Sequence, residues 1–214
     1  MRKLSDGKGE MRNPLDVEDV FHYSMKLLLA SNSPRRRELL AGLGWPFEVK
    51  VLEGIDESYP EGLSPEEVVR HIAREKAAAY TVGDDELVIT ADTIVVLGDE
   101  IMGKPTDAAD AVRMLRELSG KTHQVMTAVC MKTQCKQHEL CVITDVTFKE
   151  LSDEEIDYYV NHYKPFDKAG AYGIQEWIGY VGVTAIRGSY FNVVGLPVQR
   201  IYDELRREFG VNLP

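Results

Sequence analysis

An apolar run that stops at small polar residues and continues into arginines constrains the fold more than any other segment of the chain. Leu27–Ala30 is apolar, and the polar run Ser31-Asn32-Ser33 leads through Pro34 to Arg35 and Arg36. Ser33 suits the N-cap of a helix, and Pro34 suits its first position. The segment therefore predicts a buried strand, a tight loop and the N-terminus of a helix.

A strand that ends at a helix N-terminus is a typical place to bind an anion. We expect unpaired backbone N–H groups and the positive end of the helix dipole to meet there. Arg35 and Arg36 add guanidinium groups, which match phosphate oxygens in pairs. Since an arginine at a helix N-terminus opposes the dipole, a purely structural role is slightly unfavourable. The segment favours a polyphosphate site, but two arginines alone leave an exposed basic turn as an alternative of about equal weight.

The net charge of the chain excludes several classes of partner. The chain has 25 Lys and Arg residues against 35 Asp and Glu residues, a net charge of −10. This charge disfavours a general attraction to a nucleic acid polymer or an anionic membrane. No stretch has the length of a membrane span, and the residues before Ser24 lack the apolar centre of a signal peptide. An anionic ligand must therefore be held by a local cluster of positive charge.

The cysteines indicate neither a zinc site nor a disulfide framework. There are three, Cys130, Cys135 and Cys141, an odd number without the two-residue spacing of zinc sites. We expect reduced thiols. A single bridge between Cys130 and Cys141 across a hairpin stays open as an alternative under oxidising conditions.

Length and composition indicate one globular domain. The hydrophobic fraction is 44% and the charged fraction 28%, as in ordinary globular proteins. A chain of 214 residues can form one large domain or two small lobes that share a sheet. We expect this domain over residues 25–214, preceded by a weakly ordered extension over residues 1–24 with a short helix at 16–23.

Helices and strands alternate in the first part of the domain, and hairpins follow. Ser64 with Glu67 and Ser152 with Glu155 form capping boxes at the starts of two helices. This order is typical of an α/β protein with a mixed sheet. The expected strands are residues 25–31, 47–52, 87–97, 101–102, 123–133, 139–150, a short one around Ile174, 180–186 and 190–194. The expected helices are residues 34–43, 64–80, 106–118, 152–161 and 197–209.

Asp92 is the candidate catalytic residue. It lies within a strand that is otherwise suited to burial on both faces. An isolated carboxylate there costs free energy unless it binds something. It can accept a proton from water or help hold Mg²⁺, whereas the structural alternative is a buried ion pair with a nearby lysine. We favour the functional interpretation because Thr93 follows and the carboxylate falls at the expected edge of a ligand cleft.

Three further segments are weaker candidates when each is taken alone. Lys76 lies on a predicted helix, where a solvated lysine is the simplest interpretation. Lys104 lies between Gly103 and Pro105, which constrain a loop just after the Asp92 strand, although turn lysines are common. The run rich in Gly and Ala before Gln175 implies tight packing against a ligand base or another strand. The Gln175 amide can read the edge of a base.

Taken together, these segments resemble the Maf family of nucleotide pyrophosphatases. The matches follow one another in sequence order and cover nearly the whole chain from Lys26 to Tyr202. Each match is weak alone, but eight in order are specific. They are Ser31–Arg36 with Glu38–Leu40, Glu75–Ala77, Ala91–Thr93, Gly103–Pro105, His123–Val125 with Thr127, Thr144–Phe148, Lys168–Gln175 and Asn192–Pro197.

The resemblance implies a cytoplasmic enzyme that hydrolyses a nucleoside triphosphate between its α and β phosphorus atoms. The products are a nucleoside monophosphate and pyrophosphate, and a divalent cation, Mg²⁺ or Mn²⁺, is required. The implied fold is an elongated mixed sheet flanked by helices, with two lobes and a central cleft, similar to that of inosine triphosphate pyrophosphatases. The resemblance also implies a homodimer.

The resemblance assigns roles to particular residues. Asp92 matches the proton acceptor, and Glu57 matches a carboxylate that helps Asp92 hold the metal. Arg35, Thr93 and Gln175 match the positions that mark the branch preferring dTTP and UTP. The remaining matches are polar positions that bind phosphate or base, namely Ser31, Arg36, Lys76, Lys104 and Lys168.

One position departs from the family pattern, and two alternative functions stay open. Many relatives have Glu-Pro before the Asp-Lys-Ala-Gly-Ala-Tyr run, where this chain has Lys164-Pro165. That exchange puts in doubt any metal or water contact at this position. The alternatives are the sister branch that cleaves 7-methyl-GTP, and a nucleotide-binding regulator of septum formation without turnover. The set of Asp92, Lys104 and Arg35 favours catalysis over the regulator.

Overall fold

The computed structural model describes residues 25–214, so the extension expected at residues 1–24 lies outside the described residues. The strands are β1 (Lys26–Leu29), β2 (Phe47–Val49), β3 (Glu86–Leu97), β4 (Glu100–Met102), β5 (Thr122–Lys132), β6 (Gln137–Phe148) and β7 (Val183–Arg187). The helices are α1 (Pro34–Ala41), α2 (Pro65–Ala78), α3 (Ala108–Leu118), α4 (Asp153–Tyr163), the 3₁₀ turn η1 (Ala169–Ala171), α5 (Trp177–Gly182), α6 (Tyr190–Val194) and α7 (Val198–Phe209).

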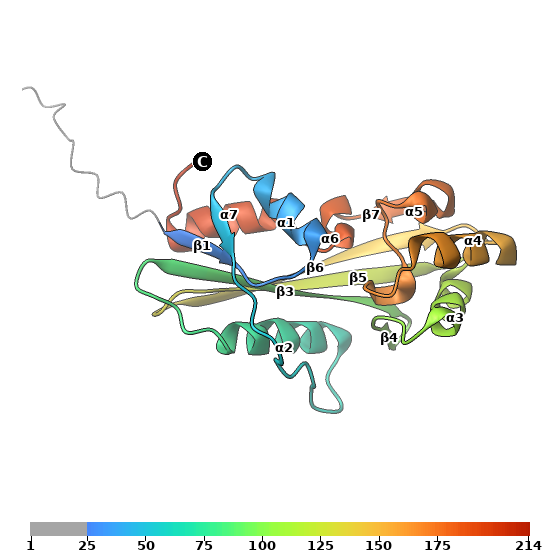
Figure 1. Cartoon of the computed structure of the whole chain (residues 1–214), viewed down its shortest axis with the longest axis horizontal. Coiled ribbons are helices and arrows are strands. Elements are labelled where there is room, and N and C mark those ends of the chain that lie inside the picture. The colour runs from blue at the N-terminus through green and yellow to red at the C-terminus, as the bar shows by residue number, and fades with distance from the viewer. Residues whose placement is uncertain (1–24) are drawn as a thin grey trace, which may run out of the picture.

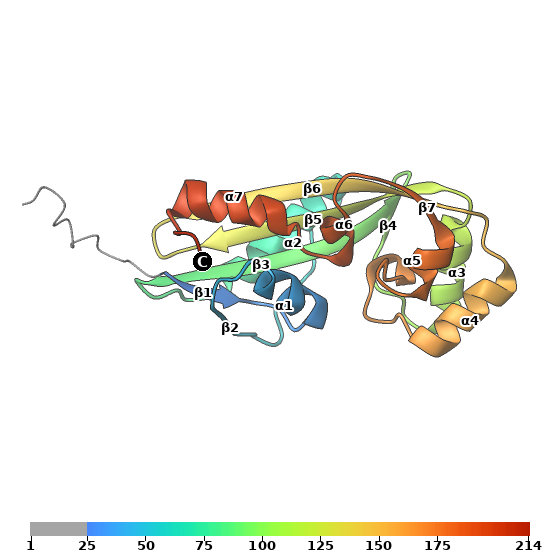
Figure 2. The ribbon, with the colours of Figure 1, turned by 90° about the horizontal axis from the view of Figure 1, so that it is seen from above.

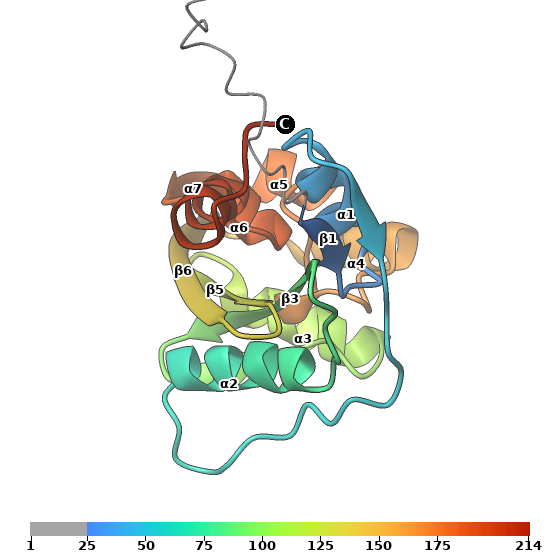
Figure 3. The ribbon, with the colours of Figure 1, turned by 90° about the vertical axis from the view of Figure 1, so that its left-hand side faces the viewer.

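One mixed sheet runs through the whole domain, as the sequence predicts. The strand order is β2-β1-β3-β5-β6-β7, with β4 paired to β3. The two pairs formed by β1 are parallel, and the other pairs are antiparallel. The sheet lies along the length of the molecule, with α1 and α7 on one face and α2 on the other (Figures 1 and 3). This arrangement confirms the predicted elongated α/β fold.

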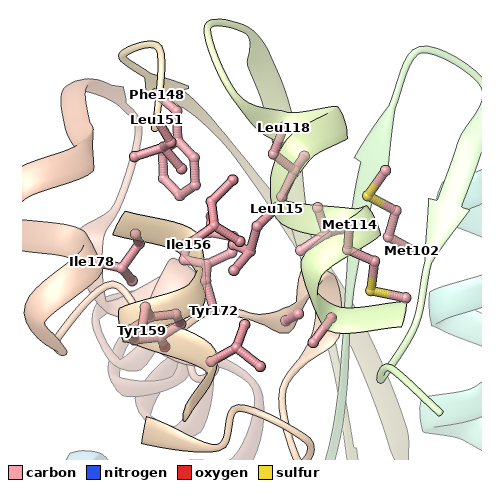
Figure 4. Packing of buried hydrophobic residues seen from close by; sticks show 14 of the residues in the cluster. Met102, Met114, Leu115, Leu118, Phe148, Leu151, Ile156, Tyr159, Tyr172 and Ile178 are labelled. Carbon is pink, nitrogen blue, oxygen red and sulfur yellow. The ribbon is translucent and has the colours of Figure 1, made fainter. Parts of the chain in front are cut away.

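The two lobes of the domain have separate clusters of buried side chains. In the first lobe, α7 packs on one face of β1, β3 and β5 through Ile201 and Leu205. On the opposite face, α2 packs on β3 and β5 through Val69 and Ala73. In the second lobe, α3, α4 and α5 gather at the other end of the sheet (Figure 2). Figure 4 shows the core of that lobe, in which side chains from these helices and the sheet surround Leu115, Ile156 and Tyr172.

The side of β3 that faces β1 is open in the middle of the strand. On that side β1 pairs with β3 only as far as Ile89, and β4 pairs with it only from Val95. Within the described chain, residues 90–94 have β5 on one side and no strand on the other. Because successive side chains of a strand point to opposite faces, this gap gives access to side chains from both faces of the sheet.

The helix starts confirm the predicted capping chemistry. Ser64 with Glu67 and Ser152 with Glu155 form complete capping boxes at the starts of α2 and α4. Ser33 caps α1, and Pro34 is its first residue. These side chains bond the free N–H groups of a first turn, which is why the starts of these helices were readable from the sequence.

The strands expected in the last third of the chain were partly wrong. Residues 190–194 form the helix α6, because the Ser189 hydroxyl accepts a hydrogen bond from the Asn192 N–H and caps a helical turn. The strand expected at 180–186 starts only at Val183, because residues 180–182 end α5. Ile174 lies in a turn and belongs to no strand.

The three cysteines lie on β5, on β6 and in the turn between these strands. Cys130 lies opposite Glu139 in the β5–β6 hairpin, and Cys141 lies opposite Ala128, so the two thiols do not face each other directly. Both are free, and burial raises the pKa of the Cys130 thiol to about 12.

Among residues 25–214, no helix is both long enough and apolar enough to cross a bilayer.

Candidate active site

A cavity of about 640 Å³ opens at the gap in β3, between the two lobes. Its walls include five cationic side chains and three carboxylates, a local excess of positive charge in a chain of net charge −10. All ten residues that the sequence predicts for the site line this one cavity. They are Ser31, Arg35, Arg36, Glu57, Lys76, Asp92, Thr93, Lys104, Lys168 and Gln175.

Asp92 and Lys76 meet on the α2 side of the sheet. The Lys76 ammonium lies 2.8 Å from Asp92 Oδ1 and 3.0 Å from Glu57 Oε1, so it links the two carboxylates. The Asp92 side chain keeps 15% of its surface exposed, and Asp92 is among the residues that line the cavity. The ion pair with a nearby lysine, which the sequence left as the structural alternative, is therefore present together with access to the cavity.

The carboxylates of Glu57 and Asp92 fit a small divalent cation that is shared with a substrate. Mg²⁺ is usually held by one or two carboxylates together with phosphate oxygens and waters. The one group of three or more potential metal-ligating side chains found in residues 25–214, His138, Glu204 and Glu208, lies away from the cavity on β6 and α7. The cavity thus offers the donors for a metal bound with a triphosphate, and no closed protein cage.

Arg36 is bound to the protein itself. From the other face of the sheet, its guanidinium donates to Ala91 O at 2.8 Å, to Gly195 O at 2.9 Å and to Thr93 Oγ1 at 3.0 Å. The Ala91 carbonyl lies on the open edge of β3, where a neighbouring strand would otherwise supply a donor. Arg36 therefore closes the edge of the sheet beside the cavity, and burial lowers its pKa.

Thr93 joins this hydrogen-bonded wall from β3. Its hydroxyl lies 3.0 Å from the Thr127 hydroxyl, which also bonds to Asn192 O at 3.1 Å. The contact connects β3, β5 and α6. The sequence indicates Asn192 and Thr127 as parts of the family pattern without a role. Their contacts give them one, because they support the wall on which Arg36 and Thr93 lie.

The start of α1 offers fewer free N–H groups than expected. Pro34 has none, and the N–H groups of Arg36 and Arg37 bond to Ser33. The Ser33 N–H in turn bonds to the Ser31 hydroxyl at 3.2 Å. A ligand at this helix start would therefore meet side chains more than backbone donors.

Arg35 reaches across the cavity to the second lobe. Its guanidinium lies 2.9 Å from Asp167 Oδ2, and the other oxygen of that carboxylate lies 2.7 Å from the Lys168 ammonium. Lys168 is buried and also lies 3.1 Å from Glu176. Asp167 and Glu176 were missed as site residues because an acid beside a lysine is ordinary on a protein surface; the run rich in Gly and Ala around them was the only signal.

Gln175 and Lys104 complete the walls. The Gln175 side-chain oxygen is buried and has no hydrogen-bond partner in the part of the chain that the structure describes, so it is an acceptor that a ligand can satisfy. A Cβ on Gly173 would come within 2.8 Å of the Gln175 amide nitrogen, so this glycine is needed for the amide to lie there. Lys104 is exposed on its loop at the cavity.

The position that departs from the family pattern lies outside the cavity. Lys164 is the exposed C-cap of α4, with a left-handed backbone, and it is not among the residues that line the cavity. A positive charge is favourable at the C-terminal end of a helix. The exchange of Glu for Lys therefore changes a helix end and removes no side chain from the site.

Comparison with known proteins agrees with this geometry. The family model described as "Maf-like protein" matches residues 26–208. Relatives named "dTTP/UTP pyrophosphatase" from Phocaeicola vulgatus and Bacteroides fragilis are 62% and 57% identical to this chain. Each alignment spans 184 residues and covers 85% of this chain and 95% of the relative. A solved dITP/XTP pyrophosphatase of Mycobacterium abscessus is more distant, with 16% identity and a TM-score of 0.41 over 89% of this chain and all of that one. The chain belongs to the Maf family.

Proposed function

We propose that this protein hydrolyses nucleoside triphosphates, with dTTP and UTP preferred, to the nucleoside monophosphate and pyrophosphate. One observation carries the proposal, which is that residues from separate segments of both lobes line a single cavity with an excess of positive charge. The relatives named dTTP/UTP pyrophosphatase support the choice of substrate, since this chain covers 95% of their length.

The cations of the cavity would bind the triphosphate. Arg35, Lys76 and Lys104 come from α1, α2 and the loop after β4, so they reach the phosphates from different directions. Charge neutralisation of this kind stabilises the negative charge that moves onto the leaving pyrophosphate as its bond to the α phosphorus breaks. We assign phosphate binding to these three side chains, with Ser31 and Lys168 as further polar contacts.

Asp92 would act on the water. A carboxylate at the cavity wall can accept the proton that a water molecule loses when its oxygen bonds to phosphorus. The Lys76 ammonium, 2.8 Å from Asp92 Oδ1, keeps the carboxylate in place on the cavity wall. After the step, the proton lies on Asp92, the new P–O bond is in the nucleoside monophosphate, and the electron pair of the broken P–O bond has left with pyrophosphate.

Glu57 and Asp92 would hold a divalent cation, Mg²⁺ or Mn²⁺. When bound, such an ion supplies further neutralisation of the phosphate charge. The support for this assignment is the pair of carboxylates already linked by Lys76 on the cavity wall.

Gln175 would select the base. Uracil and thymine carry an N–H donor between two carbonyl acceptors, which complements a side chain with one acceptor and two donors. Cytosine has a bare ring nitrogen in place of this N–H and an amino group in place of one carbonyl, so in the same pose it would set an acceptor against the buried Gln175 oxygen. Sites with buried polar groups discriminate strongly against a ligand that cannot pair with them. We therefore place Gln175 at the base end, with Arg35 and Thr93 as the other residues that mark the preference.

Two properties of the whole protein belong to this proposal. We infer a cytoplasmic location, where nucleoside triphosphates occur and where the three free thiols would stay reduced. We also infer a homodimer. Its support is the family resemblance together with exposed aromatic and apolar side chains around β7 and α6, among them Tyr180, Ile186, Tyr190 and Phe191.

A pyrophosphate-release panel tests the proposed function. The eight common nucleoside and deoxynucleoside triphosphates and 7-methyl-GTP are each incubated with the protein and Mg²⁺, with and without EDTA. We expect dTTP and UTP to be cleaved well ahead of dCTP and the purines, with all activity lost in EDTA. A strong preference for 7-methyl-GTP would place the protein in the sister branch, and binding of dTTP without turnover would support the regulator instead.

A further inference from the structure

One carboxylate holds two cations of the cavity that come from different lobes. Asp167 contacts Arg35 of α1 through Oδ2 at 2.9 Å and Lys168 through Oδ1 at 2.7 Å. Arg35 and Lys168 are 133 residues apart in the chain, and each lines the cavity. Both oxygens of Asp167 are therefore used to fix cationic side chains on the cavity wall.

The contact continues into the backbone that carries Gln175. Lys168 lies 3.1 Å from Glu176 Oε1, and the other oxygen of Glu176 accepts a hydrogen bond from the Tyr159 hydroxyl. That hydroxyl accepts a hydrogen bond from the Gly173 N–H at 2.9 Å. The network thus starts at Arg35, passes through side chains of alternating charge, and ends at the turn before Gln175. The fully buried Tyr159 of α4 holds that turn in place.

The electrostatics of the network keep Asp167 charged. Burial alone would raise its pKa, but the hydrogen bonds from Lys168 and Arg35 outweigh burial and lower the pKa to about 2. Lys168, with only 9% of its side chain exposed, lies between two carboxylates. A buried ammonium is stable only when it is paired, so Asp167 is one of the two groups that allow a lysine at this position.

We propose that Asp167 is a positioning residue, which holds Arg35 and Lys168 at fixed places so that the two lobes present their cations to the nucleotide together. The inference rests on the proposed function, because it assigns to Asp167 a part in binding the same substrate. Long cationic side chains lose rotamer freedom when they bind a ligand, and a side chain that is already held loses less. Asp167 therefore lowers the KM of the nucleotide and contributes less to kcat.

The test compares Asp167→Asn with a matched control, Asp153→Asn. Asp153 also accepts a hydrogen bond from an arginine, Arg116, at 2.9 Å, but it is the first residue of α4 and is not in the cavity lining. For Asp167→Asn we expect KM for dTTP to rise about tenfold, with kcat changed about twofold or less. Asp167→Glu, which keeps the charge, should recover part of the loss. Asp153→Asn should match the wild type.

Two further measurements keep the inference distinguishable from the proposed function. In the Arg35→Gln background, Asp167→Asn should raise KM by much less than tenfold, because a positioning residue acts through its partner. Binding of a non-hydrolysable dTTP analogue to each variant is measured by calorimetry. If the wild type neither binds the analogue nor cleaves dTTP, the proposed function is wrong. If the wild type is active and Asp167→Asn keeps the wild-type KM, the positioning role is wrong. It is also wrong if Asp167→Asn changes kcat and KM by the same factors with Arg35 present as it does in the Arg35→Gln background.

Discussion

Arg35 and Arg36 are neighbours on α1, yet their guanidinium groups have different partners. Arg36 turns into the protein and bonds to three oxygens at the open edge of β3. Arg35 turns across the cavity to a single exposed carboxylate. A ligand phosphate can compete for Arg35 without breaking the sheet edge, whereas displacement of Arg36 would leave the Ala91 and Gly195 carbonyls without these donors.

Replacement of Arg36 by lysine should destabilise the fold. A lysine ammonium cannot reproduce the planar fork that serves three oxygens, so at least one buried acceptor loses its donor. We expect the free energy of unfolding to fall by about 1–3 kcal/mol, measured by urea denaturation. Arg37→Lys is the control, because Arg37 is exposed and its side chain makes a single long hydrogen bond within residues 25–214, to Asn32 at 3.4 Å. Equal stability of the two variants would contradict the structural role of Arg36.

The difference between these two arginines could not be predicted from the sequence. The two arginines are adjacent in the first turn of the helix, and both are compatible with a phosphate site at the helix start. What separates them is the open edge of β3, which depends on how far β1 and β4 pair with it. Asp92 and the capping serines were predictable because each is a local departure from a regular pattern, a charge in an apolar strand or a hydroxyl at the start of a helix.

At the scale of elements, the gap in β3 and the turn at η1 shape the cavity. Gly170 has a φ of 65°, and its N–H bonds to Gly103 O at 3.0 Å, which holds η1 against the loop after β4. A Cβ at this glycine would lie within 3.1 Å of three atoms of Val95, a buried residue of β3. The close approach places Lys168 and Ala169 at the cavity.

Gly170→Ala should be destabilising for both of these reasons. The left-handed backbone is unfavourable for alanine, and the added methyl group overlaps a packed side chain. We expect the free energy of unfolding to fall by about 1–3 kcal/mol, measured by thermal and urea denaturation. Gly103→Ala serves as the comparison, since its Cβ would meet nothing within 4 Å. If both alanine variants were as stable as the wild type, the close packing of η1 on β3 would be wrong.

The helix α6, which the sequence placed as a strand, depends on distant contacts as well as on a local cap. Residues 190–194 are rich in aromatic and β-branched side chains, which favour a strand. They form α6 because Ser189 caps the turn and the Asn192 amide donates to Val125 O and to the Thr144 hydroxyl. Those partners lie on β5 and β6, far away in the chain, so no local pattern could indicate them.

At the scale of the whole molecule, β3, β5 and β6 connect the two lobes, and the cavity lies where the lobes meet. The core of the second lobe contains His123, which is 1% exposed and bonds through Nε2 to the Tyr172 hydroxyl at 2.7 Å. Tyr172 lines the cavity. Burial lowers the pKa of His123 to about 4, so it is neutral in the folded protein at physiological pH.

This histidine should make the stability of the protein depend on pH. Between pH 6.5, its ordinary pKa, and about 4, the unfolded chain binds a proton at His123 that the folded protein does not. The free energy of unfolding should therefore fall as the pH falls through this range, by up to about 1.4 kcal/mol per pH unit. His123→Gln should show a shallower slope in urea denaturation between pH 6.5 and 4.5. Parallel slopes for the two proteins would show that His123 titrates normally.

The most direct test of the central claim is the identity of the products that the protein forms from dTTP, with Asp92→Asn measured beside the wild type. Phosphorus NMR should show dTMP and pyrophosphate from the wild type in the presence of Mg²⁺, and a rate lower by about 10²–10⁴-fold for Asp92→Asn. Asp99→Asn, an exposed change in the turn after β3, should match the wild type. Release of dTDP and phosphate, or a rate that Asp92→Asn leaves unchanged, would contradict the claim that this cavity hydrolyses the α–β bond with Asp92 as proton acceptor.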